Sequence, residues 1–132
     1  MVDKIAFDLV SPERLLLSDA ADMVTIPGTE GYMGVMAGHS PVISTLRPGT
    51  ITVQGASAGD ARYFIRGGFA EITAGTLTVL AEEAIPLAEV NVAMLDQRIR
   101  DTEEDVAAAK SDSDKARAIE VLDDLRQVRA AF

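Results

Sequence analysis

The chain has 132 residues, a mass of 14.0 kDa and a formal net charge of −9, with 48% hydrophobic residues. It therefore has enough apolar side chains for one ordinary core with a small appendage, but not the length for two large domains. The excess of acidic groups argues against a protein that binds nucleic-acid phosphates or anionic lipid, because both need clustered Lys and Arg.

The cysteine and histidine content limits the chemistry of the chain. There is no cysteine and one histidine, which excludes disulfides, thiolate metal sites, cysteine nucleophiles and multi-histidine metal centres. The carboxylates of the segment DTEED, residues 101–105, would lie around a helix rather than converge, so we interpret them as a solvated face. We expect neither a metal site nor a cofactor.

The N-terminal segment and the hydropathy of the chain argue against export and membrane insertion. The first residues, MVDKIAFDLVS, contain acids and no long apolar run, unlike a signal or transit peptide. No segment approaches the roughly 18 to 20 apolar residues that a membrane-spanning helix requires. We expect a soluble protein without direct membrane insertion.

Residues 1–86 are expected to form an antiparallel β-sandwich domain. Apolar and polar residues alternate with the period of a strand in five short runs, at 5–9, 24–26, 51–53, 63–65 and 77–79. Turn signals rich in Gly, Pro, Ser and Asp separate the runs, at 11–12, 27–28, 48–49, 57–60, 67–68 and 74–75. Because no helical segment lies between these strands, the pattern favours an antiparallel sandwich or barrel over a parallel sheet.

Residues 87–132 contain neither glycine nor proline and are expected to form an antiparallel two-helix hairpin domain. Apolar positions recur at steps of three and four residues, at Val92, Leu95, Ile99, Thr102 and Val106, and again at Ala118, Val121, Leu122, Leu125, Val128 and Phe132. Asn91 is suited to cap the first helix, and Ser111 or Ser113 the second. Because the stripes are narrow, we expect packing on the sandwich or on another protein to hold the hairpin in place.

The glycine-rich segment PGTEGYMGVMAGHSPV, residues 27–42, is not a nucleotide-binding loop. Its glycines are spaced G-x-x-G-x-x-G, no Gly-Lys-Ser/Thr follows, and the next residues, 35–42, have a strand-like pattern instead of a helix N-terminus. The glycines are better explained by turns that need a positive φ. Because Glu30, Tyr32 and nearby methionines are not needed for a turn, we expect them to form a contact surface.

His39 raises an enzymatic alternative, a small hydrolase in which this histidine acts with Ser40 or Asp60. Ser40 is the next residue in the chain, and neighbouring residues of a strand face opposite sides. A general base without an evident nucleophile and orienting acid is weak support for catalysis. We expect a turn histidine bound to backbone or to a partner, and no catalytic residue.

Several motifs in register resemble the epsilon subunit family of F-type proton-translocating ATP synthases. The main match is GTEGYMGVMAGHSPVISTLRPGTI, residues 28–51, with its G-x-x-G-x-x-G, G-H-x-P and L-x-P-G elements. Three further segments occur in the same order as in that family. One precedes the main match, FDLVSPERLLLSDAADMVTIPG (7–28), and two come after it, GGFAEI (67–72) and LTVLAEEA (77–84). The resemblance covers nearly the whole chain, and it implies the same β-sandwich and helical hairpin.

The resemblance implies a non-catalytic subunit of the central rotor stalk. Its sandwich would bind the gamma subunit and sit on the ring of c subunits, coupling proton translocation to ATP synthesis. Glu30, Gly31 and Tyr32 would face the polar loops of the ring. His39, Ser40 and Pro41 would lie near the ring and gamma. The chain would be peripheral at the cytoplasmic face of a bacterial inner membrane, since no transit segment precedes the sandwich.

The sequence departs from the family pattern at two places. Relatives commonly have an acid where Tyr32 stands, so Glu30 is the remaining acidic group for a basic ring loop. Relatives that bind ATP do so through an Ile-Asp-x-x-Arg-Ala motif, whereas this chain has Asn91 and Met94 in place of its Asp and Arg. Because Met has no charged donor for a phosphate, we expect no nucleotide binding.

The family resemblance also implies regulation by the hairpin. In some relatives the hairpin extends toward the alpha and beta subunits and blocks ATP hydrolysis. Residues 87–132 contain 7 Lys and Arg against 11 Asp and Glu, whereas a helix that reaches an acidic catalytic region should be cationic. We therefore expect weaker inhibition than in those relatives. The alternative function is a nucleotide-sensing regulatory module that acts through its C-terminal helices.

Overall fold

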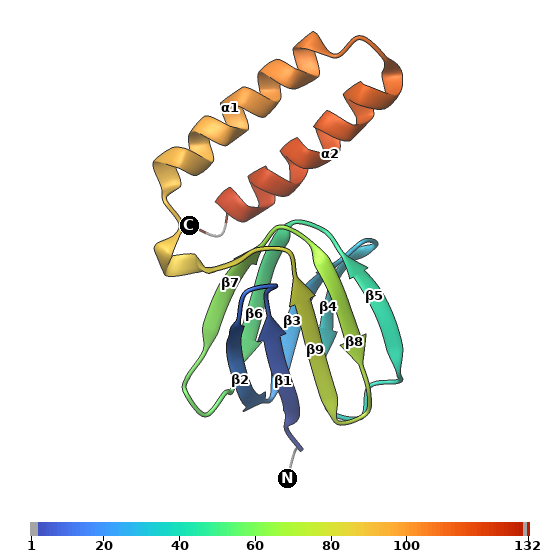
Figure 1. Cartoon of the computed structure of the whole chain (residues 1–132), viewed down its shortest axis with the longest axis vertical. Coiled ribbons are helices and arrows are strands. Elements are labelled where there is room, and N and C mark those ends of the chain that lie inside the picture. The colour runs from blue at the N-terminus through green and yellow to red at the C-terminus, as the bar shows by residue number, and fades with distance from the viewer. Residues whose placement is uncertain (1–2, 131) are drawn as a thin grey trace. The chain divides into compact units, whose positions relative to one another are not determined.

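The computed structural model describes residues 3–130 and 132 (Figure 1). The contacts within the chain divide it after Ala88 into two compact units. The first unit contains only strands and connections up to a short 3-10 helix at Leu87–Glu89, and the second contains two helices. This order, a domain of short strands followed by a pair of helices, is the fold class predicted from the sequence periodicity.

The first unit is a curled sheet of ten strands. They are β1 Ile5–Val10, β2 Leu15–Ala21, β3 Met23–Gly28, β4 Gly31–Val35, β5 Val42–Leu46, β6 Gly49–Gln54, β7 Ala61–Ile65, β8 Gly68–Ile72, β9 Thr76–Ala81 and β10 Ala84–Pro86. The order is β10-β7-β6-β3-β5-β8-β9-β1-β2, with β4 paired to β3. All pairs are antiparallel except β1 with β9.

The sheet curls because β3 and β5 are joined at one residue pair, Gly28 with Leu46. On one side of this junction lie β4, β3, β6, β7 and β10, and on the other lie β5, β8, β9, β1 and β2, as two facing layers (Figure 1). The predicted antiparallel sandwich is confirmed. The parallel pair of β1 and β9 was not predicted, because alternation gives the facing of a strand but not its neighbour.

The core between the layers is aliphatic apart from Phe7. The alternation of β1 directs Ile5, Phe7 and Leu9 inward, and all three are 0% exposed. Equivalent side chains from the other strands complete the core, among them Val24, Ile26, Val35, Ile51, Val53, Ile65, Ile72, Leu77 and Val79. Burying a side chain of this size contributes roughly 1.5 to 3 kcal/mol, so the sandwich has a strong apolar basis.

Two sequence expectations in the glycine-rich segment were wrong. Pro27 and Gly28 are buried residues of β3, and the turn follows them at Thr29 and Glu30. The predicted strand pattern of residues 35–42 is interrupted, because β4 ends at Val35 and a loop continues to β5. Gly38 has a φ of +88° in this loop, a backbone conformation that favours glycine and differs from that of a strand.

The second unit contains α1, Val92–Ala108, and α2, Asp112–Arg129. The predicted cap at Asn91 is confirmed, since Asn91 Oδ1 accepts from Met94 N at 3.1 Å. Of the two serines considered for the second helix, Ser111 is the cap, because its Oγ accepts from Asp114 N at 3.1 Å. The buried residues include Leu95, Thr102, Leu122, Leu125 and Val128, in agreement with the predicted stripes. Val121 and Phe132 are 42% and 47% exposed, so those two members of the second stripe were predicted wrongly.

Two ion pairs link the helices of the second unit. Arg129 Nε donates to Asp96 Oδ1 at 2.8 Å, and Arg126 binds Glu103 at 3.4 Å. All four side chains are more than a third exposed. Exposed pairs of this kind contribute about 0 to 1 kcal/mol each, and we infer that they set the register of the two helices more than their stability.

Candidate functional site

The tip of the β3–β4 hairpin presents two of the predicted contact residues. Thr29 and Glu30 form the turn, and Gly31 follows with a φ of +133°, with no neighbouring atom where a side chain would begin. Gly28 needs to be glycine for a different reason, because a Cβ there would lie 2.9 Å from the Gly31 carbonyl oxygen. The backbone at this point is therefore tight on one side and open on the other, and the Glu30 side chain is exposed at the tip.

Tyr32 has a structural role that the sequence did not reveal. Its hydroxyl accepts a hydrogen bond from Thr50 N at 3.1 Å. A Cβ at Gly49 would lie 2.8 Å from the same hydroxyl and 2.8 Å from Pro27 Cβ. The ring therefore spans from β4 across β3 to the start of β6, and it remains 48% exposed. Tyr32 holds the hairpin in place while part of its ring stays on the surface.

His39, Ser40 and Pro41 lie in the loop between β4 and β5. His39 Nδ1 is 2.8 Å from the Ser40 carbonyl oxygen, and His39 N donates to the Met36 carbonyl oxygen at 3.2 Å. Asp60 binds Gly55 N at 2.8 Å in the β6–β7 connection. The histidine thus has a backbone partner, and the acid of the hydrolase alternative is engaged elsewhere.

A groove lies between the β3–β4 hairpin and β5. Its volume is about 430 Å³, and it is lined by residues 28–33 and 42–45. Val42 and Ile43 on its wall are 41% and 74% exposed. Glu30, at the turn, is the one side chain in the lining that is charged at neutral pH. The sequence analysis missed Val42 and Ile43, although an apolar pair directly after Pro41 was the signal that could have indicated them.

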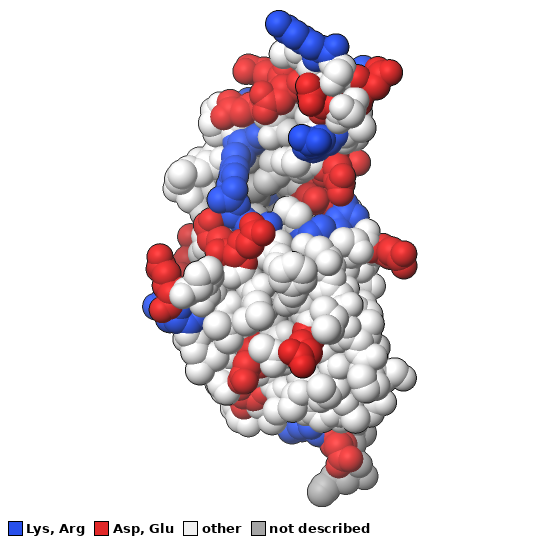
Figure 2. Space-filling view, turned by 45° about the vertical axis from the view of Figure 1, so that its right-hand side comes forward, with Lys and Arg blue, Asp and Glu red and all other residues white. Residues whose placement is uncertain are grey.

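A row of uncharged residues crosses the outer face of the layer that contains β5. The strand register aligns Thr45, Phe69, Leu80, Val10 and Leu15 across β5, β8, β9, β1 and β2. We call these five residues the apolar stripe. Phe69, Leu80 and Leu15 are 55%, 53% and 58% exposed. Figure 2 shows the sandwich as a broad surface with few charged groups on this side.

The sequence could have indicated the apolar stripe from breaks in the alternation. In β8 and β9, Phe69 and Leu80 take positions that alternate with buried Gly68, Ala70, Val79 and Ala81. Those positions face outward, where a half-buried strand normally has polar residues. The inward residues alone are enough to predict the strands, so the prediction did not include these two.

A cluster of polar contacts fixes the other end of the sandwich. Asp19 Oδ2 accepts from Ala58 N at 3.0 Å, and this hydrogen bond is the main cause that holds the pKa of Asp19 below its usual value. Lys4 binds the Gly55 carbonyl oxygen and Asp22. These contacts attach the β6–β7 connection to β1 and β2, and we interpret them as structural.

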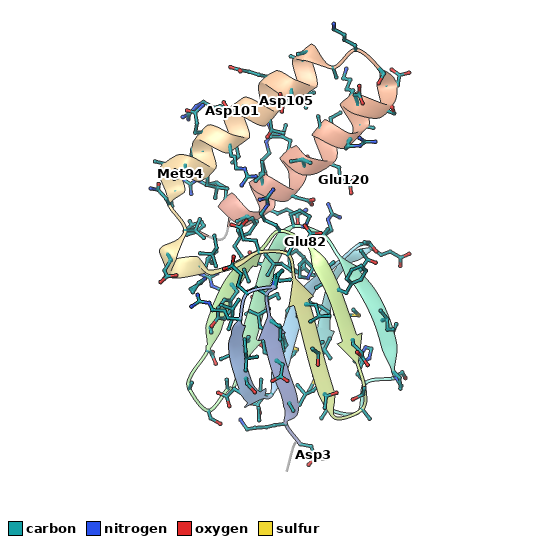
Figure 3. All side chains as sticks on the ribbon, in the orientation of Figure 1. Asp3, Glu82, Met94, Asp101, Asp105 and Glu120 are labelled. Carbon is teal, nitrogen blue, oxygen red and sulfur yellow. The ribbon has the colours of Figure 1, made fainter. Side chains whose placement is uncertain are left out.

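The positions of the two-helix unit that depart from the ATP-binding motif are on the surface. Met94 is 69% exposed near the start of α1 and provides no charged donor (Figure 3). Asp101, on the same helix, accepts from Gln97 Nε2 at 2.8 Å. Among the described residues there is no group of three or more acidic or histidine side chains that could hold a metal ion. Within the same residues, no helix is long and apolar enough to cross a membrane.

The amino-acid sequence has close relatives among ATP synthase subunits. Residues 4–87 match the family model of the ATP synthase delta/epsilon chain, beta-sandwich domain. An ATP synthase epsilon chain of Parvibaculum lavamentivorans is 55% identical over 129 residues, which cover 98% of this chain and 98% of the relative. An ATP synthase epsilon chain of Mesorhizobium japonicum is 45% identical over 132 residues, 100% of this chain and 98% of the relative.

Solved structures agree with the fold over both units. A chain in a cryo-EM structure of the Euglena gracilis mitochondrial ATP synthase, comprising OSCP, F1 and the c ring, aligns with a TM-score of 0.83 at 25% identity. The match covers 98% of this chain and 81% of that chain. A chain from the central stalk and c ring of the Tetrahymena thermophila enzyme aligns with a TM-score of 0.69 at 13% identity, which supports the fold alone.

Proposed function

The chain belongs to the family of ATP synthase epsilon chains, which are non-catalytic subunits of the complex, and we propose that it couples proton translocation to ATP synthesis by joining the gamma subunit to the c ring. Its structural relatives include a chain from an assembly of F1 with the c ring. The work of such a subunit is mechanical. It needs a stiff body and two contact surfaces, one for each partner.

The apolar stripe is the observation that carries this proposal. Phe69, Leu80 and Leu15 are each more than half exposed and lie in one row. Large exposed apolar side chains that lie together mark interaction surfaces, because the removal of apolar surface from water is favourable. We propose that gamma covers this stripe. A sandwich with a close-packed, fully buried apolar core then transmits force between its two partners with little deformation.

The β3–β4 turn is the proposed contact with the c ring. Glu30 is exposed at its tip, where it can reach a basic group on a polar loop of the ring. Tyr32 contributes through its bond to Thr50 N, which fixes the turn, and through the exposed part of its ring. Gly31 gives the turn its shape. His39, Ser40 and Pro41 are proposed to lie near the ring and gamma.

The two-helix hairpin, α1 and α2, is proposed to bind the alpha and beta subunits only weakly. Its surplus of acidic over basic residues opposes entry into an acidic catalytic region. We therefore propose weak inhibition of ATP hydrolysis and no nucleotide site at Asn91 and Met94. No contact among the described residues favours the nucleotide-sensing alternative. As part of the complex, the chain is proposed to be peripheral at the cytoplasmic face of a bacterial inner membrane.

A charge in the apolar stripe tests the proposed function. Phe69→Glu removes an exposed aromatic side chain and would place a carboxylate against gamma, so we expect binding to purified gamma to weaken by about 100-fold. Membranes reconstituted with this variant should lose ATP synthesis driven by proton flux. Gln54→Glu adds the same charge to the exposed end of β6 and serves as the control. Equal, unchanged gamma binding by both variants would refute the role of the stripe.

A further inference from the structure

The free edge of β5 differs from the other free edges of the sheet in the described residues. A strand edge with unpaired backbone groups is normally protected by a charge, a proline or shortness, and glycines weaken a strand and so make its edge a poorer template. β10 has three residues and ends in Pro86, β2 contains Asp19, and β4 contains Gly31 and Gly34. β5 has the sequence VISTL and none of these features.

β5 is paired along its whole length on one side and almost nowhere on the other. Residues 42–46 all pair with β8, whereas on the opposite side β5 meets β3 only through Leu46 and Gly28. The 430 Å³ groove borders this second side, with β4 and the β3–β4 turn beyond it. In Figure 1, β5 accordingly lies at the margin of its layer, next to β8.

The direction of the free backbone groups follows from one hydrogen bond. Arg47 N donates to the Pro27 carbonyl oxygen at 3.0 Å, so the N–H of Arg47 points to β3. Backbone N–H groups alternate sides along a strand. Those of Thr45 and Ile43 therefore point toward the groove, and those of Ser44 and Val42 point toward β8.

The side chains around this edge select an apolar occupant. Val42 and Ile43 are 41% and 74% exposed, and the groove wall holds no charge apart from Glu30 at the turn. Thr45 belongs both to the groove and to the apolar stripe, so the two surfaces are continuous. A polar loop of the c ring does not match this chemistry, whereas an apolar segment of gamma does.

We propose that a short extended segment of gamma enters the groove and pairs with residues 42–45 as an added strand. This proposal rests on the proposed function, since it names the gamma segment that continues from the apolar stripe. The edge of four residues is about 13 Å long at roughly 3.3 Å per residue. The segment receives the backbone hydrogen bonds of Ile43 and Thr45 and places apolar side chains over Val42 and Ile43, the mode of strand addition.

Amide hydrogen exchange of the full chain, free and bound to purified gamma, tests the proposal directly. In the free chain, the amides of Ser44 and Leu46 should be protected by β8, and those of Ile43 and Thr45 should exchange rapidly. On gamma binding, we expect the exchange of Ile43 and Thr45 to slow by at least about tenfold, the factor for a hydrogen bond worth about 1.4 kcal/mol.

Three variants separate the backbone from the side chain. Ile43→Ala and Ile43→Pro both remove the isoleucine side chain, but only proline removes the N–H that points to the groove. We expect Ile43→Pro to fold, since proline is tolerated at a strand edge, and to bind gamma about tenfold more weakly than Ile43→Ala. Ser44→Pro removes an N–H that faces β8 and should lower the melting temperature.

The outcomes distinguish this proposal from the proposed function. Binding of gamma without slower exchange at Ile43 and Thr45, or equal affinities for Ile43→Ala and Ile43→Pro, would overturn strand addition and leave the joining of gamma intact. Absence of gamma binding altogether would overturn both. If the amides of Ile43 and Thr45 exchanged more slowly in the free chain as the concentration of the chain was raised, a second copy of this chain would be the occupant. That result would also overturn the proposal.

Discussion

In the sandwich, ten strands send aliphatic side chains from two layers into one core, whereas the hairpin has two helices and few buried residues. Phe7, Ile51 and Val79 in the sandwich are 0% exposed, but Ile119 and Val121 on α2 are about 40% exposed. Because burial of apolar area provides most of the stability of a domain, the two units should respond differently to the same kind of perturbation. The sandwich is suited to carry force, and the hairpin to change its contacts.

The largest expected difference comes from removing one buried side chain in each unit. Phe7→Ala leaves a cavity in the sandwich core and should cost about 3 to 5 kcal/mol of unfolding free energy. Leu125→Ala should melt the hairpin locally and leave the sandwich transition unchanged. Unfolding followed by NMR signals from each unit measures both effects. If Leu125→Ala lowered the stability of the sandwich as much as that of the hairpin, the two units would unfold together and the comparison would fail.

Sequence reasoning succeeded where periodicity decides the structure. The alternation of residues 5–9 placed Ile5, Phe7 and Leu9 in the core. The three- and four-residue spacing in the second unit predicted both helices, with the first cap at Asn91 and the second narrowed to two serines. It failed where long-range contacts override local signals. Pro27 and Gly28 have the sequence of a turn, yet both lie in β3, because the backbone of β3 pairs there with β4 and β5.

The candidate site was predictable in position more than in detail. The glycine spacing indicated a shaped turn with Glu30 on its surface, and the structure places both at the tip of the β3–β4 hairpin. The bond between Tyr32 and Thr50 N joins residues 18 positions apart, which no local pattern encodes. The apolar stripe depends on the register of five strands, so it also required the three-dimensional structure.

A medium effect is expected at the contact that fixes the β3–β4 hairpin. Tyr32→Phe leaves Thr50 N without its acceptor and should reduce the unfolding free energy by about 0.5 to 1.5 kcal/mol. The amides near Gly31 should exchange faster, while the amides of the two-helix unit, α1 and α2, should exchange at unchanged rates. Tyr63→Phe removes a hydroxyl from β7 and serves as the control. Equal stability of the two variants would show that the Tyr32 bond does not hold the turn, and that the shape of the hairpin arises from its glycines alone.

The smallest expected effect concerns Asp19, which is partly exposed and lies where the β6–β7 connection meets β2. The hydrogen bond from Ala58 N lowers the pKa of its carboxyl from the usual value of 3.8. A lowered pKa in the folded state means that ionised Asp19 stabilises the fold at pH values above 3.8, and that this contribution falls as pH drops through the folded pKa. The melting temperature of Asp19→Asn should therefore lie slightly below that of the unmodified chain at pH 7, and the two should approach each other as the pH falls below 3.8. Asp101→Asn, in the other unit, should show no such convergence in the sandwich signal. A difference between Asp19→Asn and the unmodified chain that stays constant from pH 7 to pH 3 would assign the effect to the shape of the side chain instead of its charge.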